Sequence, residues 1–79
     1  MKKCTLKQFA ALRECERDGV MIVWNCKRWV YISTVTDKRD LLGGVVAVLY
    51  DLRAQKYKAV DLSTHKRADA TILVNGRDF

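Results

Sequence analysis

The segment from Val20 to Val35 constrains the fold of this chain more than any other. It is rich in β-branched and aromatic residues, contains both tryptophans of the chain, and is typical of two β-strands joined by a tight turn. A turn centred on Cys26 and Lys27 would place Trp24 opposite Trp29. The sequence therefore predicts a β-hairpin here.

Side chains alternate across a strand, so this hairpin has one aromatic and one aliphatic face. The aromatic face collects Val20, Ile22, Trp24, Trp29 and Tyr31, and the aliphatic face collects Met21, Val23, Val30 and Ile32. We expect helices to cover the aliphatic face as the core. The aromatic face then has no assigned partner within the chain, and is either a binding surface or a core or dimer contact.

Size and charge limit the classes of function. We expect the 79 residues to form a single small domain, 1–79, whose modest core a homodimer would supplement. The net charge is +6, and no acidic residue lies between Asp18 and Asp37. A basic surface favours a nucleic acid, a nucleoprotein or an acidic protein surface as the partner.

The sequence gives no sign of a membrane or secreted protein. No apolar run approaches the roughly 20 residues of a membrane span, and no apolar segment of a signal peptide follows Met1-Lys2-Lys3. Three cysteines without clustered spacing fit reduced thiols better than disulfides. We therefore expect a cytoplasmic protein without a membrane partner.

A helix is predicted over residues 5–18. Thr5 and Gln8 have the spacing of a capping box, in which each side chain accepts a hydrogen bond from the other residue's backbone amide. Gly19 is suited to end the helix because it readily adopts the left-handed conformation.

A second helix is predicted within residues 37–55, because the apolar residues of 41–52 gather on one side of a helix. A buried strand over 45–52 is the alternative, since valine favours sheets. The opposite side of this helix would carry small residues beside a tyrosine. That side is a candidate self-association surface, made of Gly43, Ala47, Tyr50 and Ala54.

The last third predicts two strands, 56–62 and 71–74, joined by the polar connector 63–69. We expect Asn75-Gly76 to end the fold, since only three residues follow it. The predicted fold class is α+β: a two-layer sandwich of order α-β-β-α-β-β, with two helices on one face of a mostly antiparallel sheet.

Catalytic and cofactor chemistry finds little support in the sequence. Cys4, Cys15 and Cys26 are each eleven residues apart and His65 is remote, whereas structural zinc sites bring ligands as close pairs. No phosphate-binding glycine loop or nucleophile motif is present. The sequence predicts no metal, no cofactor and no enzyme activity.

We therefore expect a small basic binding module that acts on nucleic acid or a nucleoprotein. Aromatic residues on a sheet with nearby cations are typical of surfaces that stack unpaired bases. The alternative is a phage- or plasmid-type inhibitor, such as an anti-CRISPR-like protein, that blocks a host enzyme or complex by protein contact. In either case the candidate binding residues are Trp24, Lys27, Arg28, Trp29, Tyr31, Lys56, Lys58, Lys66 and Arg67.

Overall fold

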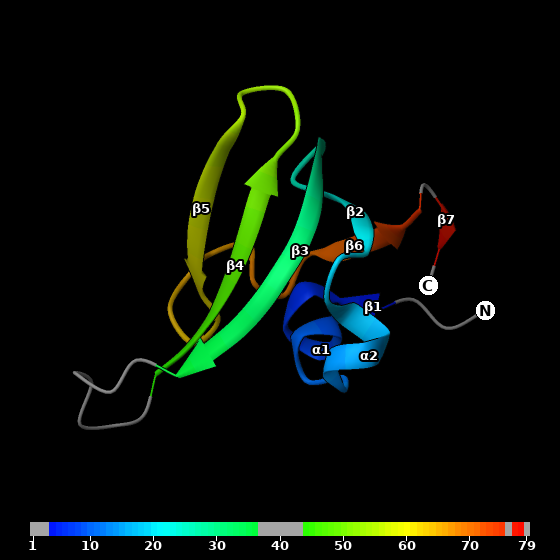
Figure 1. Cartoon of the computed structure of the whole chain (residues 1–79). Helices are drawn as coiled ribbons and strands as arrows, with labels where there is room; N and C mark the ends of the chain where they lie inside the picture. The colour runs from blue at the N-terminus through cyan, green and yellow to red at the C-terminus, as the bar shows by residue number, and fades with distance from the viewer. Residues whose placement is uncertain (1–3, 37–43, 76, 79) are drawn as a thin grey trace.

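A strongly curved antiparallel sheet with two short helices makes up the fold, broadly of the α+β class (Figure 1). The computed structural model describes residues 4–36, 44–75 and 77–78. Its elements are β1 (Cys4–Thr5), α1 (Leu6–Ala10), α2 (Glu14–Arg17), β2 (Met21–Trp24), β3 (Lys27–Thr36), β4 (Val45–Asp51), β5 (Lys56–Asp61), β6 (Thr71–Val74) and β7 (Arg77–Asp78). The strands follow the spatial order β1-β6-β2-β3-β4-β5, and β7 pairs with β6.

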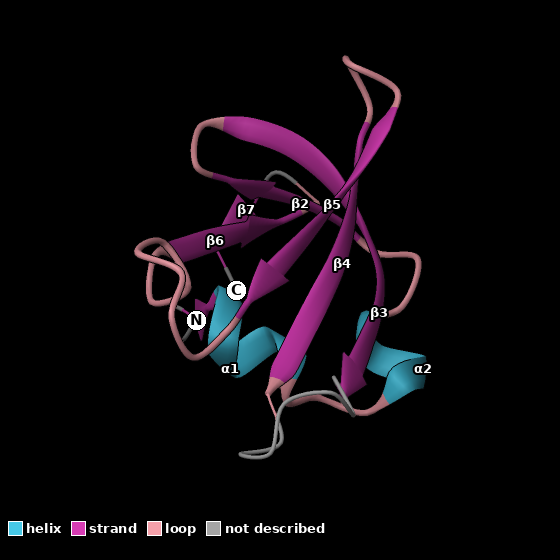
Figure 2. Cartoon of the chain, turned by 90° about the vertical axis from the view of Figure 1, so that its left-hand side faces the viewer, coloured by secondary structure: helices cyan, strands magenta, loops and turns pink. Residues whose placement is uncertain are grey.

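Curvature lets one sheet surround its own core. Figure 2 shows β6 running across the direction of β4, so the two ends of the strand order face different ways. The pairing of β3 with β4 shifts between Tyr31 and Ser33, an irregularity of the kind that increases the bend of a strand. The core is therefore enclosed mainly by sheet rather than by a layer of helices.

The β2–β3 hairpin is present, but its turn lies one residue earlier than predicted. Asn25 and Cys26 form a two-residue turn with φ angles of 53° and 61°, as a type I′ hairpin turn requires. Trp24 consequently pairs with Lys27 rather than with Trp29. Each residue of β2 therefore pairs with a residue of β3 that lies two positions earlier than predicted. Because side chains alternate along a strand, a shift of two positions leaves every side chain on the face that the sequence predicted.

The core lies on the face opposite to the one expected. The inner face of the sheet is defined by its buried side chains: Ile22, Trp24, Trp29, Tyr31, Ala47, Leu49, Val60 and Ile72. The aliphatic face, by contrast, leaves Met21 43% and Ile32 36% exposed. The assignment of that face as the core was wrong, because a small core enclosed by one curved sheet needs bulky rings to fill it.

The predicted helix 5–18 is broken into α1 and α2. The capping box is confirmed: the Gln8 amide donates to Thr5 Oγ1 at 3.1 Å, and the Thr5 amide donates to Gln8 Oε1 at 2.9 Å. A continuous helix would have placed Arg13 one turn after buried Phe9. The break instead leaves Arg13 in solvent, paired with Glu16 at 2.8 Å.

The second predicted helix is wrong, and the alternative strand is found as β4. Valines favour a central strand, and β4 pairs with both β3 and β5. The self-association surface predicted on that helix does not form: Ala47 is buried on the inner face, Tyr50 faces the other side, and Ala54 lies in the β4–β5 turn. Gly43 lies outside the described residues.

The last third of the chain agrees with the predicted strands except at its end. β5 and β6 occupy the predicted segments. The prediction that Asn75-Gly76 ends the fold was wrong, because β7 returns to pair with β6. With a strand replacing the second helix, the predicted order α-β-β-α-β-β does not hold.

Candidate functional site

Trp24 lies at the centre of the region where the predicted site residues meet. Its ring is buried, and its indole Nε1 donates a hydrogen bond to the Arg67 carbonyl at 2.8 Å. Trp29 is buried beside it, with ring centroids 5.8 Å apart, and donates from Nε1 to the Trp24 carbonyl at 2.9 Å. Both indole N–H groups thus have acceptors, which removes the main cost of burying them.

Tyr31 is buried as well. Its hydroxyl is hydrogen-bonded to Thr34, its ring meets Phe9 edge-on at 5.3 Å, and burial raises the pKa of the phenol. Of the alternatives left open for the aromatic face, the core contact is the one found: Trp24, Trp29 and Tyr31 are buried. The three buried rings support the strands that carry the site, but they offer no surface on which a base could stack.

The side chains of Lys58 and His65 contact the Trp24 ring. The Lys58 ammonium lies 5.5 Å from the ring centroid, a cation–π contact. The His65 ring lies 5.2 Å from the same ring, and His65 Nδ1 accepts a hydrogen bond from the Arg67 amide at 3.0 Å. Strand β5 and the connector 62–70 are therefore held close together over Trp24.

Further cations lie next to this contact on the same face of the sheet. Lys27 pairs directly with Trp24, and Lys56 pairs with Asp51; directly paired residues share a face, with Cβ atoms about 5 Å apart. We call the whole group the basic rim: Lys27, Arg53, Lys56, Lys58, Lys66 and Arg67. All six are exposed.

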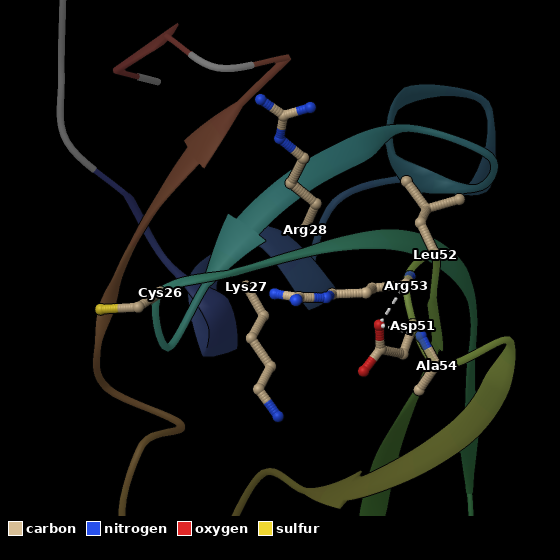
Figure 3. Close-up of a pocket in the computed structure, with 7 residues that line it drawn as sticks. All are labelled: Cys26, Lys27, Arg28, Asp51, Leu52, Arg53 and Ala54. Atoms are coloured by element: carbon tan, nitrogen blue, oxygen red, sulfur yellow. Dashed lines mark hydrogen bonds between the residues drawn. The ribbon is translucent and has the colours of Figure 1, made fainter.

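Arg28 does not belong to the basic rim. It pairs with Val23 on the outer face of the sheet, and Figure 3 shows its side chain pointing away from Lys27 and Asp51. The structure therefore brings together five of the six predicted cations, adds Arg53, and separates Arg28.

A shallow pocket of about 830 Å³ lies at one end of the basic rim, between the β2–β3 and β4–β5 turns (Figure 3). Its lining residues are Cys26, Lys27, Arg28, Asp51, Leu52, Arg53 and Ala54. The cations of this pocket come from two hairpins that are adjacent in the sheet.

Asp51 is the buried acid of this pocket, only 8% exposed. Its Oδ1 accepts hydrogen bonds from the amides of Arg53, at 2.9 Å, and Ala54, at 3.1 Å. The Ala54 amide is the main reason that the pKa of Asp51 is lowered; the charges of Lys27 and Arg53 act in the same direction. The carboxylate thus fixes the turn that presents Arg53, a role that the sequence analysis missed although an aspartate before a turn is a known signal.

Residues 4–36, 44–75 and 77–78 contain no group of three or more histidine, cysteine or acidic side chains arranged to hold a metal ion. All three cysteines are free. Burial raises the pKa of the Cys4 thiol, which makes it less reactive.

No helix within the described part of the chain has the length and apolar character needed to cross a membrane. Comparisons with known protein families, with curated proteins and with solved structures found no match. The geometry of the basic rim is therefore the main support for a function.

Proposed function

We propose that this protein binds nucleic acid through the phosphate backbone, using the basic rim. The observation that carries the proposal is that β3, the β4–β5 turn, β5 and the connector 62–70, which together carry six exposed cations, meet around Trp24 and Asp51. These segments lie far apart in the sequence, and the fold brings them together in a chain whose net charge is +6.

Backbone binding fits the burial of the tryptophans. Phosphate contacts need exposed cations but no exposed ring, and they read shape and charge rather than sequence. The pairing of Lys58 with Trp24 holds one cation in place over a rigid support, which lowers the entropy lost when it meets a phosphate. We therefore expect weak sequence preference and strong salt dependence.

The direct test is fluorescence anisotropy with a labelled single-stranded oligonucleotide and with a duplex of the same sequence. If all six cations contact phosphates, log K should fall against log salt concentration with a slope of about 4 for the single strand and about 5 for the duplex. Binding that is independent of salt, or no binding to either probe, would reject the proposal.

A matched pair of variants places the binding on the rim. Lys58→Gln with Lys66→Gln removes two rim cations, and each loss should lower the salt slope by about 1. Lys7→Gln with Arg13→Gln removes two exposed cations elsewhere, on α1 and at the start of α2. The control should bind like the unmodified chain if the rim is the site; equal losses in both pairs would indicate net charge alone.

An inhibitor that contacts an acidic protein surface is the second candidate. The pocket joins two arginines, Arg28 and Arg53, to the partly exposed Leu52, and arginine is common among the residues that dominate protein interfaces. If neither oligonucleotide binds, this candidate predicts capture of one host protein by the chain. Arg53→Gln, which removes a pocket arginine, should then lose that capture.

A further inference from the structure

The outer face of the sheet is a broad apolar surface that the described residues leave open. One row of directly paired residues crosses four strands: Met21, Val30, Tyr50 and Tyr57. The rings of Tyr50 and Tyr57 lie 4.9 Å apart. Neighbouring rows contribute Val23, Ile32, Val35, Val46, Val48 and Leu73, all partly or largely exposed.

Nothing in the described residues packs over this surface as a core. Met21, Val35 and Tyr57 are 43%, 46% and 70% exposed. The buried residues of α1 instead belong to the core on the inner face, where Phe9 meets Tyr31. Contiguous apolar surface of this kind marks an interaction site in soluble proteins.

On the part of the outer face that the structure describes, charge is confined to the two ends. Among the described side chains of β2 to β6, its charged residues are Arg28, at the end near the β2–β3 turn, and Asp61, which pairs with Val46 at the other end. The Asp61 carboxylate is ionised at neutral pH, since the Ser63 hydroxyl bonded to it at 2.7 Å lowers its pKa. The face thus has a positive end, an apolar centre and a negative end.

We propose that the occupant of this face is a second copy of the chain, packed face to face with its strands reversed. A two-fold axis lying in the interface, across the strands, places the Arg28 end of each copy over the Asp61 end of the other. Both ends are then complementary in charge, and the apolar rows cover each other as in a sandwich of two sheets. The opposite orientation brings Arg28 to Arg28 and Asp61 to Asp61, and like charges oppose it.

The surface is self-complementary without any additional component, which is the reason for choosing a second copy over an unrelated protein. A chain of this size has a small core of its own, and pairing of the outer faces would bury the large apolar side chains that folding leaves exposed. The interface is separate from the basic rim, so this inference does not depend on nucleic-acid binding.

Sedimentation velocity over a range of protein concentrations, without nucleic acid, tests the proposal. The unmodified chain should form dimers. Met21→Glu places a charge in the apolar row and should raise the dimer dissociation constant by roughly tenfold or more. Ala11→Glu adds the same charge beside α1, at an exposed position off the sheet, and should leave the dimer intact. Circular dichroism confirms that both variants are folded.

A charge exchange tests the reversed orientation separately. Arg28→Glu should weaken the dimer, because it would bring two acids together at each end. Adding Asp61→Lys to the same chain restores opposite charges and should recover most of the lost affinity. A chain that stays monomeric at all concentrations, or a dimer unaffected by Met21→Glu, overturns the proposal; failure of the double variant to recover affinity overturns the orientation.

Discussion

The inner and outer faces of the sheet are both apolar, yet they differ in how their side chains are used. The inner face carries rings with polar groups, and each tryptophan N–H on it donates to a backbone carbonyl. The outer face carries mainly aliphatic side chains, together with two tyrosines. The difference shows that the apolar character of a single residue does not decide its burial here: both faces are apolar, and the buried one holds the two tryptophans with their N–H groups satisfied.

The strongest test of this difference between the two faces is to shorten one side chain on each face and to compare the losses of stability. Trp24→Ala should lower the free energy of unfolding by about 3–5 kcal/mol, since it removes a fully buried ring. Met21→Ala, on the outer face, should cost less than about 1 kcal/mol in the monomer. Urea unfolding followed by circular dichroism, at a concentration that keeps the chain monomeric, measures both.

If Trp24→Ala does not fold, Trp24→Phe keeps one aromatic ring but loses the rest of the indole and the hydrogen bond to the Arg67 carbonyl. That variant should be destabilised by about 1–3 kcal/mol, less than Trp24→Ala. Similar losses in the free energy of unfolding for the Met21 and Trp24 variants would show that the two faces contribute equally, which would contradict the inner face as the core.

A smaller effect is expected at the β2–β3 turn, which sets the register of the hairpin. Cys26 holds a φ angle of 61°, which costs a residue with a side chain roughly 1 kcal/mol relative to glycine. Cys26→Gly should therefore stabilise the hairpin by up to about 1 kcal/mol, measured as a higher urea midpoint. Gly19→Ala is the converse control. The φ of 81° at Gly19 predicts a loss of stability, although an added Cβ atom would meet no neighbouring atom within 4 Å.

The smallest effect is confined to acid and compares one carboxylate from each face. The pKa values of Asp51 and Asp61 are both lowered, mainly by the Ala54 amide and the Ser63 hydroxyl respectively. Their contribution to stability is present above the unfolded pKa of about 3.9 and is lost as the pH falls through the lower folded values. Asp51→Asn and Asp61→Asn should each reduce the loss of stability between neutral and strongly acidic pH, measured by urea unfolding as a function of pH. An unchanged acid dependence in Asp51→Asn would contradict its role in the turn.

Local signals in the sequence were sufficient for the hairpin, β5, β6 and the capping box at Thr5. They were not sufficient for β4, because an apolar run of this length satisfies both a helical stripe and a strand. Its pairing with β3 and β5 decides between them. Tertiary pairing also determines which hairpin face is buried, and alternation along a strand carries no information on that choice.

Five of the six basic residues of the candidate site, all except Arg53, were found from the sequence because charge remains on the surface in any fold. Their grouping was not, since Arg28 and Lys27 are neighbours in sequence but lie on opposite faces. The anchoring of the connector to Trp24 through Arg67 spans 43 residues, a contact that no local pattern reveals.

Strand β5 ends the strand order of the sheet, so one side of its backbone is available to a further strand. Lys56 and Lys58 carry their charges along that border, and charged edges discourage the growth of a sheet by addition of strands. The same two lysines can thus serve the proposed binding surface while protecting the chain from fibre formation. Replacing both lysines to test the proposed nucleic-acid binding would therefore lower solubility during storage and concentration before any change in the folded state is detected.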